Sequence, residues 1–351
     1  MEFGIHFFPS VGPAQKSGEQ YFEECLRLVD RCDELDYRHV RIVEHYFHRY
    51  GGYSPNPLVF LAAASQRSKK ARVITGANLP VFNSPLKLAG EIGMIDAISG
   101  GRAEIGFGRA FLPLEYERFG VDLDESRPRF DEGLEQIRLL LENENVSSEG
   151  RFHAFKNTTS LPRPTQKPRP PFWVAAVSSP DSFAGAARMG HGVMGVPLFG
   201  PKMKEMMGVY REAWKEAGHA GKGKIMLMFH MFCWPNESEA HDLARGPINR
   251  YIEALVDAAS DWTSGASSDA YPGYDKLVEN IAKDDFESTL ARGAAWVGTP
   301  KTIIEQINEF RSTIGDIEIG SFQVNFSDMP VELAEKSMEN FSRDVMPHFK
   351  D

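Results

Sequence analysis

The residues best suited to chemistry are Glu44 and His45, which end a short apolar segment and precede a glycine-rich loop. Residues 41–43 (Arg-Ile-Val) are typical of a buried strand, and residues 51–55 read Gly-Gly-Tyr-Ser-Pro. An imidazole has an ordinary pKa of about 6.5, so it can take up and release protons near neutral pH. The sequence therefore predicts a proton-transfer site here. Two plainer interpretations stay open: His45 only caps the strand, or Glu44 pairs with Arg41 or Arg72.

Strand and helix patterns that would position this pair alternate along most of the chain. Strands are predicted over residues 2–8, 39–43, 72–79, 102–107, 172–177, 192–196, 224–232 and 318–326. Helices are predicted over residues 19–35, 86–98, 129–144, 181–189, 202–217, 237–258 and 331–346, with a further one starting at Pro57. This alternation predicts an α/β fold, a (β/α)8 TIM barrel, whose strand carboxyl ends face the active site.

Two segments do not fit the alternation. Residues from about 108 to 171 are predicted to form an insertion, whose proline-rich part, 148–171, should lie over the surface. Residues from about 259 to 293 are rich in Ser, Gly, Asp and Ala, and are longer than an ordinary connection. We predict that this second segment is a mobile lid over the carboxyl face. The whole chain, 1–351, is expected to be a single barrel domain.

Composition excludes several classes of function. The 351-residue chain carries a net charge of −10 with no basic block, which argues against nucleic-acid or anionic-membrane partners. No apolar run approaches the roughly 20 residues of a membrane span, and no signal peptide is apparent, so a cytoplasmic location is expected. Cys25, Cys32 and Cys233 lack metal-site spacing and are predicted to be buried reduced thiols. The histidine spacing predicts no metal site.

Six short motifs follow one another along the chain. They are Glu44–Phe47, Thr75–Ala77, Leu88–Glu91 with Asp96 and Ser99–Arg102, Gly106–Arg109, Ser178–Ser182, and Val297–Pro300. In kind and order they match the luciferase-like monooxygenases, the flavin-dependent barrel enzymes related to the α subunit of bacterial luciferase, and the chain resembles this family over essentially its whole length. The resemblance implies a bacterial-luciferase-like barrel with a large insertion and a flavin bound at the carboxyl ends of the strands.

The resemblance implies where the flavin phosphate binds. Arg109 follows Gly108 at the end of the fourth strand, where small residues permit close approach and a guanidinium can bind phosphate. Ser178, Ser179 and Ser182 flank the turn into a helix, where hydroxyls and free amides form an anion site. A plain helix cap is the alternative for these serines. Arg127 is predicted either to support this phosphate region or to form a surface ion pair.

The resemblance also implies which residues lie against the flavin ring. Gly76 and Ala77 stand where the family has a non-proline cis peptide beneath the ring, and two small residues in a β-branched strand leave space for a planar group. Asn78 is predicted to hydrogen-bond the pyrimidine edge of the ring. Ordinary packing of small residues is the alternative.

The catalytic residues that the resemblance implies are His45, Glu44 and Tyr46. His45 matches the family's active-site histidine, and Glu44 would fix its tautomer. Tyr46 replaces the second histidine of luciferase, and Gly108 replaces its reactive-site cysteine, so light emission is not required of this chain. Glu115 stands at the position of a family carboxylate, but is predicted to be a solvated loop acid.

Two further histidines, His6 and His230, are predicted to line the barrel or to belong to its core. A lone histidine inside a barrel is more often a hydrogen-bonded core residue than a catalyst.

The resulting hypothesis is an FMN-dependent monooxygenase. It would receive reduced FMN from a separate flavin reductase, bind dioxygen, and oxygenate a small-molecule or carrier-tethered substrate through a C4a-peroxyflavin. A homodimer is expected, with the apolar helices after the second and third strands as its interface. The alternatives are a deazaflavin-dependent oxidoreductase that transfers hydride, and a non-catalytic flavin-binding subunit.

Overall fold

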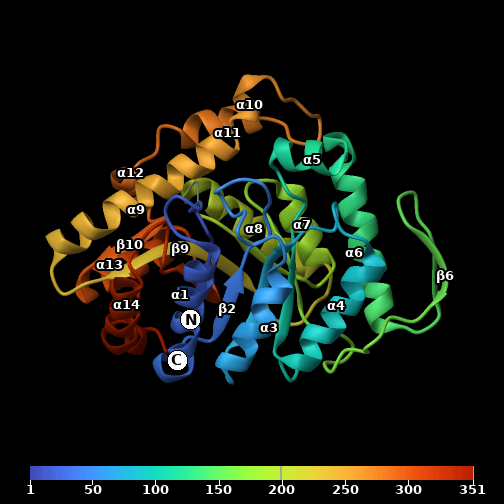
Figure 1. The fold of residues 1–351 in the computed structure, drawn as a ribbon, viewed down its shortest axis with the longest axis horizontal. Coiled ribbons are helices and arrows are strands. Elements are labelled where there is room, and N and C mark those ends of the chain that lie inside the picture. The colour runs from blue at the N-terminus through green and yellow to red at the C-terminus, as the bar shows by residue number, and fades with distance from the viewer. Residues whose placement is uncertain (198–199, 351) are drawn as a thin grey trace.

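Eight parallel strands form a closed barrel in the computed structural model, which describes residues 1–197 and 200–350 (Figure 1). The barrel strands are β1 (Glu2–Phe7), β2 (His39–Ile42), β3 (Arg72–Asn78), β4 (Ala103–Phe107), β7 (Phe172–Ala175), β8 (Gly192–Gly195), β9 (Ile225–Cys233) and β11 (Ile319–Gln323). Their order is β9-β11-β1-β2-β3-β4-β7-β8, and pairing of β8 with β9 closes the ring. The predicted α/β barrel is therefore confirmed, and each strand begins within one residue of its predicted start.

Helices surround the barrel and follow its strands in the predicted alternation (Figure 1). They are α1 (Gly18–Asp30), α2 (Cys32–Leu35), α3 (Pro57–Arg67), α4 (Pro85–Ile98), α5 (Pro113–Phe119), α6 (Ser126–Glu142), α7 (Pro180–Arg188), α8 (Gly200–Glu216), α9 (Glu237–Ala258), α10 (Asp261–Ser264), α11 (Tyr274–Ile281), α12 (Phe286–Ala291), α13 (Pro300–Thr313) and α14 (Val331–Asp344), with short 3-10 turns at Leu123–Glu125 and Met346–His348. The predicted helix over 19–35 is divided at Arg31 into α1 and α2.

Several parts of the chain contain elements that the sequence patterns did not predict, among them helix α13. The strand β10 (Ala295–Gly298) pairs with the end of β9, and the Trp296 ring stacks on Phe229 with centroids 3.8 Å apart. Helix α5 occupies a stretch expected to be irregular, although Pro113 at its first turn and Gly120 at its left-handed end are ordinary helix signals. The segment 259–293 contains α10, α11 and α12, so it is largely helical instead of a plain loop.

The insertion before β7 contains a two-stranded antiparallel hairpin, β5 (Val146–Glu149) and β6 (Ala154–Thr158). In Figure 1 the β6 segment projects from the side of the barrel beside α6. The expectation that this proline-rich region lies over the surface is confirmed, although the hairpin itself was not predicted. This region lies far along the chain from the strand ends that carry Glu44 and His45.

Apolar side chains close the interior of the barrel below the strand ends. One buried cluster consists of five inward side chains from five strands: Ile74, Trp173, Met194, Met226 and Ile319. The three cysteines are buried and free, as predicted. Among residues 1–197 and 200–350, no helix combines the length and apolar character needed to cross a membrane.

Candidate active site

His45 lies just beyond β2 and is held by a buried carboxylate. Its Nδ1 is 3.0 Å from Oε1 of Glu115, a side chain of α5 with no solvent exposure, while the whole His45 residue is 8% exposed. A carboxylate can only accept, so this contact places the proton on Nδ1 and leaves Nε2 as an acceptor. The prediction that Glu115 is a solvated loop acid is therefore wrong, and Glu115 takes the tautomer-fixing role expected of Glu44.

The loop after β2 is shaped to bury this histidine. Gly51 has a φ of +82°, and a Cβ on it would lie 2.5 Å from Cβ of His45. Only glycine tolerates both the left-handed backbone and the close approach. The rings of Phe8, Tyr50 and Phe111 surround the imidazole at centroid distances of 5.5, 5.4 and 5.9 Å. The environment of His45 is thus apolar except for Glu115.

Glu44 accepts four hydrogen bonds, one from its own loop and three from the end of β3 and the loop that follows it. Its carboxylate receives the Tyr46 hydroxyl at 2.5 Å, Nδ2 of Asn83 at 2.9 Å, Nδ2 of Asn78 at 3.0 Å and the backbone N–H of Leu79 at 3.2 Å. Burial raises the pKa of Glu44 above its ordinary value, although these donors oppose that shift. The predicted pairings of Glu44 with His45, Arg41 or Arg72 are wrong, since Glu44 instead organises the loop after β3.

Tyr46 joins the two carboxylates. Its hydroxyl donates to Glu44, and its backbone N–H donates to Oε1 of Glu115 at 2.9 Å. Burial, and next the Glu44 charge, raise the pKa of the Tyr46 hydroxyl, so it remains a donor. The three predicted catalytic residues therefore form one hydrogen-bonded group with Glu115. The sequence marked Glu115 as a family carboxylate but could not show its burial against His45, because the two residues are 70 positions apart.

Gly76 and Ala77 occupy different surroundings, although they are adjacent. Their peptide bond is cis, as the resemblance implied. A Cβ on Gly76 would lie 1.9 Å from Nε of Arg41, so the space beside Gly76 is taken by that arginine. Ala77 instead lies against Gly108, and a Cβ on Gly108 would be 3.3 Å from Cβ of Ala77, 3.4 Å from Cδ2 of Leu79 and 3.7 Å from Cβ of Ala175. The small-residue surface suited to a flat ring is therefore Ala77, Gly108 and Ala175.

Asn78 carries an unused acceptor at the same strand end. Its Nδ2 is committed to Glu44, while its buried Oδ1 has no hydrogen-bond partner in the described part of the chain. A buried polar atom without a partner is unfavourable, so an N–H of a bound ligand is the expected complement. This arrangement fits the predicted contact of Asn78 with the N–H of a flavin pyrimidine ring.

The serine turn after β7 is met by Arg127 from α6. Nη2 of Arg127 lies 3.0 Å from Oγ of Ser182, and Nη1 of Arg127 is 4.0 Å from a carboxylate oxygen of Asp131, so the predicted surface ion pair is present and Arg127 also reaches the serine turn. Ser179 caps α7 by accepting from the backbone N–H of Ser182 at 3.4 Å. Ser178 is partly exposed beside it. The structure thus combines the helix cap with a guanidinium at the same turn.

Arg109 is directed toward the 259–293 segment. Nη1 of Arg109 donates to the carbonyl of Ala270 at 2.9 Å, and its guanidinium lies 4.3 Å from the centre of the Tyr271 ring. Burial raises the pKa of the Asp131 carboxyl, and the nearby Arg127 and Arg109 guanidiniums oppose that shift. Both arginines therefore lie in one neighbourhood, with Arg109 held by the segment that covers it.

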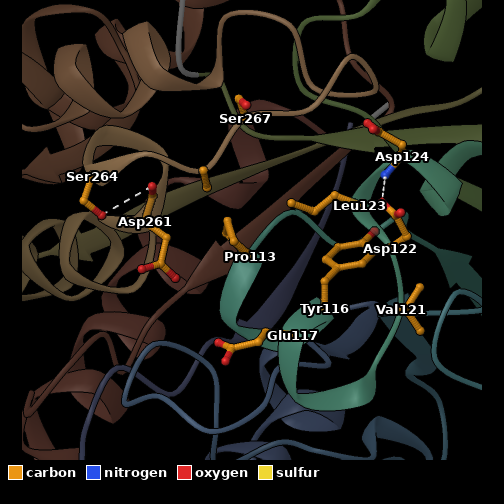
Figure 2. A pocket seen from close by; sticks show the side chains of 11 residues that line it. Pro113, Tyr116, Glu117, Val121, Asp122, Leu123, Asp124, Asp261, Ser264 and Ser267 are labelled. Carbon is orange, nitrogen blue, oxygen red and sulfur yellow. Dashed lines mark hydrogen bonds between the residues drawn. The ribbon is translucent and has the colours of Figure 1, made fainter.

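A cavity of about 460 Å³ lies where α5 meets the 259–293 segment (Figure 2). Figure 2 shows Tyr116 and Glu117 from α5 on one side and Asp261 and Ser264 from α10 on the other. The Tyr116 hydroxyl contacts the Tyr271 hydroxyl at 2.7 Å and also donates to the Arg109 carbonyl. The cavity thus borders the contact between the segment and the loop after β4, and none of the predicted catalytic residues lines it.

Comparison with known proteins decides the family. A family model described as "Luciferase-like monooxygenase" matches residues 1–316. The chain belongs to the luciferase-like monooxygenases. The predicted family is therefore confirmed, and the prediction of a flavin-dependent monooxygenase is confirmed at the level of the family.

Individual luciferase-like monooxygenases resemble the chain along its full length. It is 29% identical to the oxygenase component of a flavin-dependent trigonelline monooxygenase from Acinetobacter baylyi, covering 100% of this chain and 96% of the relative. The crystal structure of monooxygenase RslO1 from Streptomyces bottropensis is 42% identical, covers 100% of both chains and superposes with a TM-score of 0.90. The oxygenating constituent of 3,6-diketocamphane monooxygenase from Pseudomonas putida, solved with FMN, shares the fold at 22% identity, 99% and 98% coverage, and a TM-score of 0.81.

Proposed function

We propose that this luciferase-like monooxygenase is the oxygenase component of a two-component system that uses reduced FMN and dioxygen to oxygenate an organic substrate. The observation that carries the proposal is the buried pair of His45 and Glu115 after β2, together with the small-residue surface of Ala77 and Gly108 at the ends of the next two strands, β3 and β4. The relative from Acinetobacter baylyi, itself an oxygenase component, supports the same reading.

The residues around the pair have complementary tasks in this proposal. FMN, when bound in its reduced form, would supply the activation of dioxygen. Asn78 Oδ1 would accept from the flavin ring, and Arg127 with Ser182 would hold the phosphate. His45, with Nε2 left as an acceptor, would take or return the proton that accompanies oxygen transfer. The apolar rings around His45 would keep water away from this step.

An anaerobic titration of the protein with reduced FMN, followed by a pulse of oxygen, tests the proposed function. We expect a transient absorbance band that differs from those of both reduced and oxidised FMN. Binding of a deazaflavin cofactor together with no transient band would instead support a hydride-transferring oxidoreductase. Tight FMN binding with no reaction of any tested kind would support a non-catalytic flavin-binding subunit.

Removal of the guanidinium at the serine turn should weaken phosphate binding selectively. We expect Arg127→Met and Arg109→Met each to weaken FMN binding about tenfold or more, because hydrogen bonds to charged groups contribute about 1.5–3 kcal/mol. Riboflavin lacks the phosphate, so its affinity should change less than about threefold. Fluorescence titration with both ligands measures this, and Arg118→Met on α5 is the matched control. Equal losses for the two ligands would remove these arginines from the phosphate site.

We also propose that residues 1–351 act as one barrel unit in which 259–293 is a lid that excludes water. Trp262 of α10 is buried and donates to the Phe111 carbonyl at 2.8 Å, while the Tyr271 hydroxyl donates to the Ala110 carbonyl at 3.0 Å. These contacts join the lid to the loop after β4. The end of the barrel carrying α5, α10 and α11 is visible at the top of Figure 1.

Loosening the lid should expose the reaction to water. Trp262→Ala is expected to increase the rate of hydrogen peroxide release several-fold after an oxygen pulse to protein loaded with reduced FMN, because water would reach the site sooner. A peroxide assay measures this, with Trp234→Ala near the start of α9 as the control. An unchanged rate in Trp262→Ala would count against the lid.

The reductase partner follows from the proposed reaction. A flavin reductase must supply reduced FMN, and the substrate class includes small and carrier-tethered molecules. A cytoplasmic location stays a prediction.

We propose a homodimer through α3 and α4, whose surfaces expose Val59, Leu86, Met94 and Ile98. Sedimentation of the wild type as a monomer would exclude that dimer.

A further inference from the structure

Four polar side chains form a row across adjacent strands inside the barrel. His6 on β1 is in register with Arg41 on β2 and with Gln323 on β11, and Gln323 is in register with His230 on β9. Each of the four residues is 6% exposed or less. Side chains alternate along a strand, so His230 and Gln323 share the inward face with Met226 and Ile319 of the apolar cluster, each four positions earlier on the same strand. The row is therefore a polar layer above an apolar floor.

Every member of the row has a buried atom without a partner. Nε and Nη1 of Arg41, Nδ1 of His6, Nε2 of His230 and Oε1 of Gln323 make no hydrogen bond within residues 1–197 and 200–350. The remaining arginine contact is long, since Nη2 of Arg41 donates to the Gly76 carbonyl at 3.3 Å. Buried polar atoms in proteins are nearly always satisfied, so several unsatisfied atoms in one layer indicate a missing partner.

The charge of the row is also uncompensated. No salt bridge joins Arg41 to a carboxylate in the described chain, whereas Arg72, on the next strand, contacts both Glu2 and Glu104. Burial lowers the pKa of Arg41 to about 10, which leaves it protonated at neutral pH. Burial also lowers the pKa of His6 well below its usual range and that of His230 to about 3, so both are neutral. The row therefore carries one full positive charge, and its natural complement is an anionic oxygen.

The row lies next to the proposed catalytic group. The Phe8 ring contacts His45 at 5.5 Å, His6 at 6.1 Å and Tyr251 at 5.5 Å, measured between ring centroids. Tyr251 in turn lies 4.7 Å from His230. One aromatic side chain thus separates the row from His45. A planar molecule of modest size that contacted the row could also reach the neighbourhood of the imidazole.

We propose that Arg41, His6, His230 and Gln323 form a subsite for an anionic oxygen of the organic substrate: a carboxylate, phenolate or enolate. The inference rests on the proposed function, because it assigns the acidic group to the molecule that is oxygenated. Arg41 supplies the charge, and the neutral histidines supply N–H donors. Nε2 of Gln323 donates to the Phe8 carbonyl in a long contact of 3.4 Å, and a rotation that exchanges O and N gives up this contact to present the N–H₂ to the anion. A neutral hydrocarbon would leave the guanidinium unpaired and would bind less well.

Calorimetric titration of the FMN-loaded protein with acetate and benzoate tests this subsite, with acetamide and benzamide as neutral controls. We expect the acids to bind at least tenfold more tightly than the amides. Arg41→Met should weaken acid binding tenfold or more, since about 1.4 kcal/mol corresponds to tenfold. Arg41→Lys keeps the charge and should lose less, and Arg72→Met, whose guanidinium already has carboxylate partners, should match the wild type. These measurements need no oxygen chemistry, so they stand even if the proposed monooxygenation fails.

Several results would overturn the subsite. Equal binding of acids and amides by the wild type would mean that only water fills the row. If the wild type and Arg41→Met bound the acids equally, Arg41 would not be part of the subsite. If Arg41→Met weakened the binding of reduced FMN but not of the acids, the row would contact the flavin and not the substrate. If Arg41→Met does not fold, His230→Phe serves in its place, with an expected loss of about threefold for the acids. An unchanged affinity in His230→Phe would then overturn the proposal.

Discussion

His45→Ala is expected to lower the rate of substrate oxygenation about 10²–10⁴-fold, the usual contribution of a positioned acid or base. FMN affinity should change less than about threefold, because the predicted ring and phosphate contacts do not involve this side chain. Rapid-mixing measurements of product formed per bound FMN, with a substrate that the wild type converts, provide the test. Wild-type turnover in His45→Ala would exclude His45 from the mechanism.

Glu115→Gln tests the orientation of the His45 imidazole, because the variant keeps the ring and changes only the group that orients it. An amide can donate to Nδ1 as well as accept from it, so the variant permits the tautomer that the carboxylate excludes. We expect a smaller loss, about 10- to 100-fold, and no additional loss when Glu115→Gln is combined with His45→Ala. If the two losses multiplied instead, Glu115 would act independently of the histidine. Glu117→Gln, on the exposed face of α5, is the matched control.

Glu44→Ala should lower the free energy of unfolding by about 3–5 kcal/mol, because it leaves the donors of Tyr46, Asn78, Asn83 and Leu79 without their acceptor. A decrease in Tm of about 5 °C or more is the corresponding thermal result. Differential scanning calorimetry measures it, and Glu117→Ala should change stability by no more than about 0.5 kcal/mol. Equal Tm values for Glu44→Ala and wild type would mean that the network does not stabilise the fold.

The raised pKa of Glu44 gives a defined pH dependence. A carboxyl whose pKa is higher in the folded protein contributes most to stability below its unfolded pKa of about 4.3, and that contribution is lost as pH rises through the folded value. Glu44→Gln cannot ionise. Wild-type stability should therefore fall relative to Glu44→Gln as pH increases across this window, and parallel Tm profiles of the two proteins would contradict the assignment.

Local patterns predicted the elements better than they predicted the contacts. The eight barrel strands were located from short, largely apolar segments, although polar residues interrupt several of them, such as Arg41 in β2 and His6 in β1. Strand β10 was missed because its four residues carry too little signal, and the stacking of Trp296 on Phe229 is a tertiary contact. The helices of the 259–293 segment lie in a composition rich in Ser, Gly and Asp, and their aromatic residues Trp262 and Tyr271 find partners only on the loop after β4.

The sequence by itself determined the barrel, the family and the strand end that carries His45, because these depend on periodicity and on motifs of adjacent residues. The tertiary structure decided which groups act together. It brought Glu115 to His45 across 70 positions and Arg127 to Ser182 across 55. It also aligned Arg41 with His6 and His230 through strand register, although the strands are far apart in the chain. A carboxylate or guanidinium has no sequence signal for its partner, since that partner is set by how parallel strands and their loops meet in space.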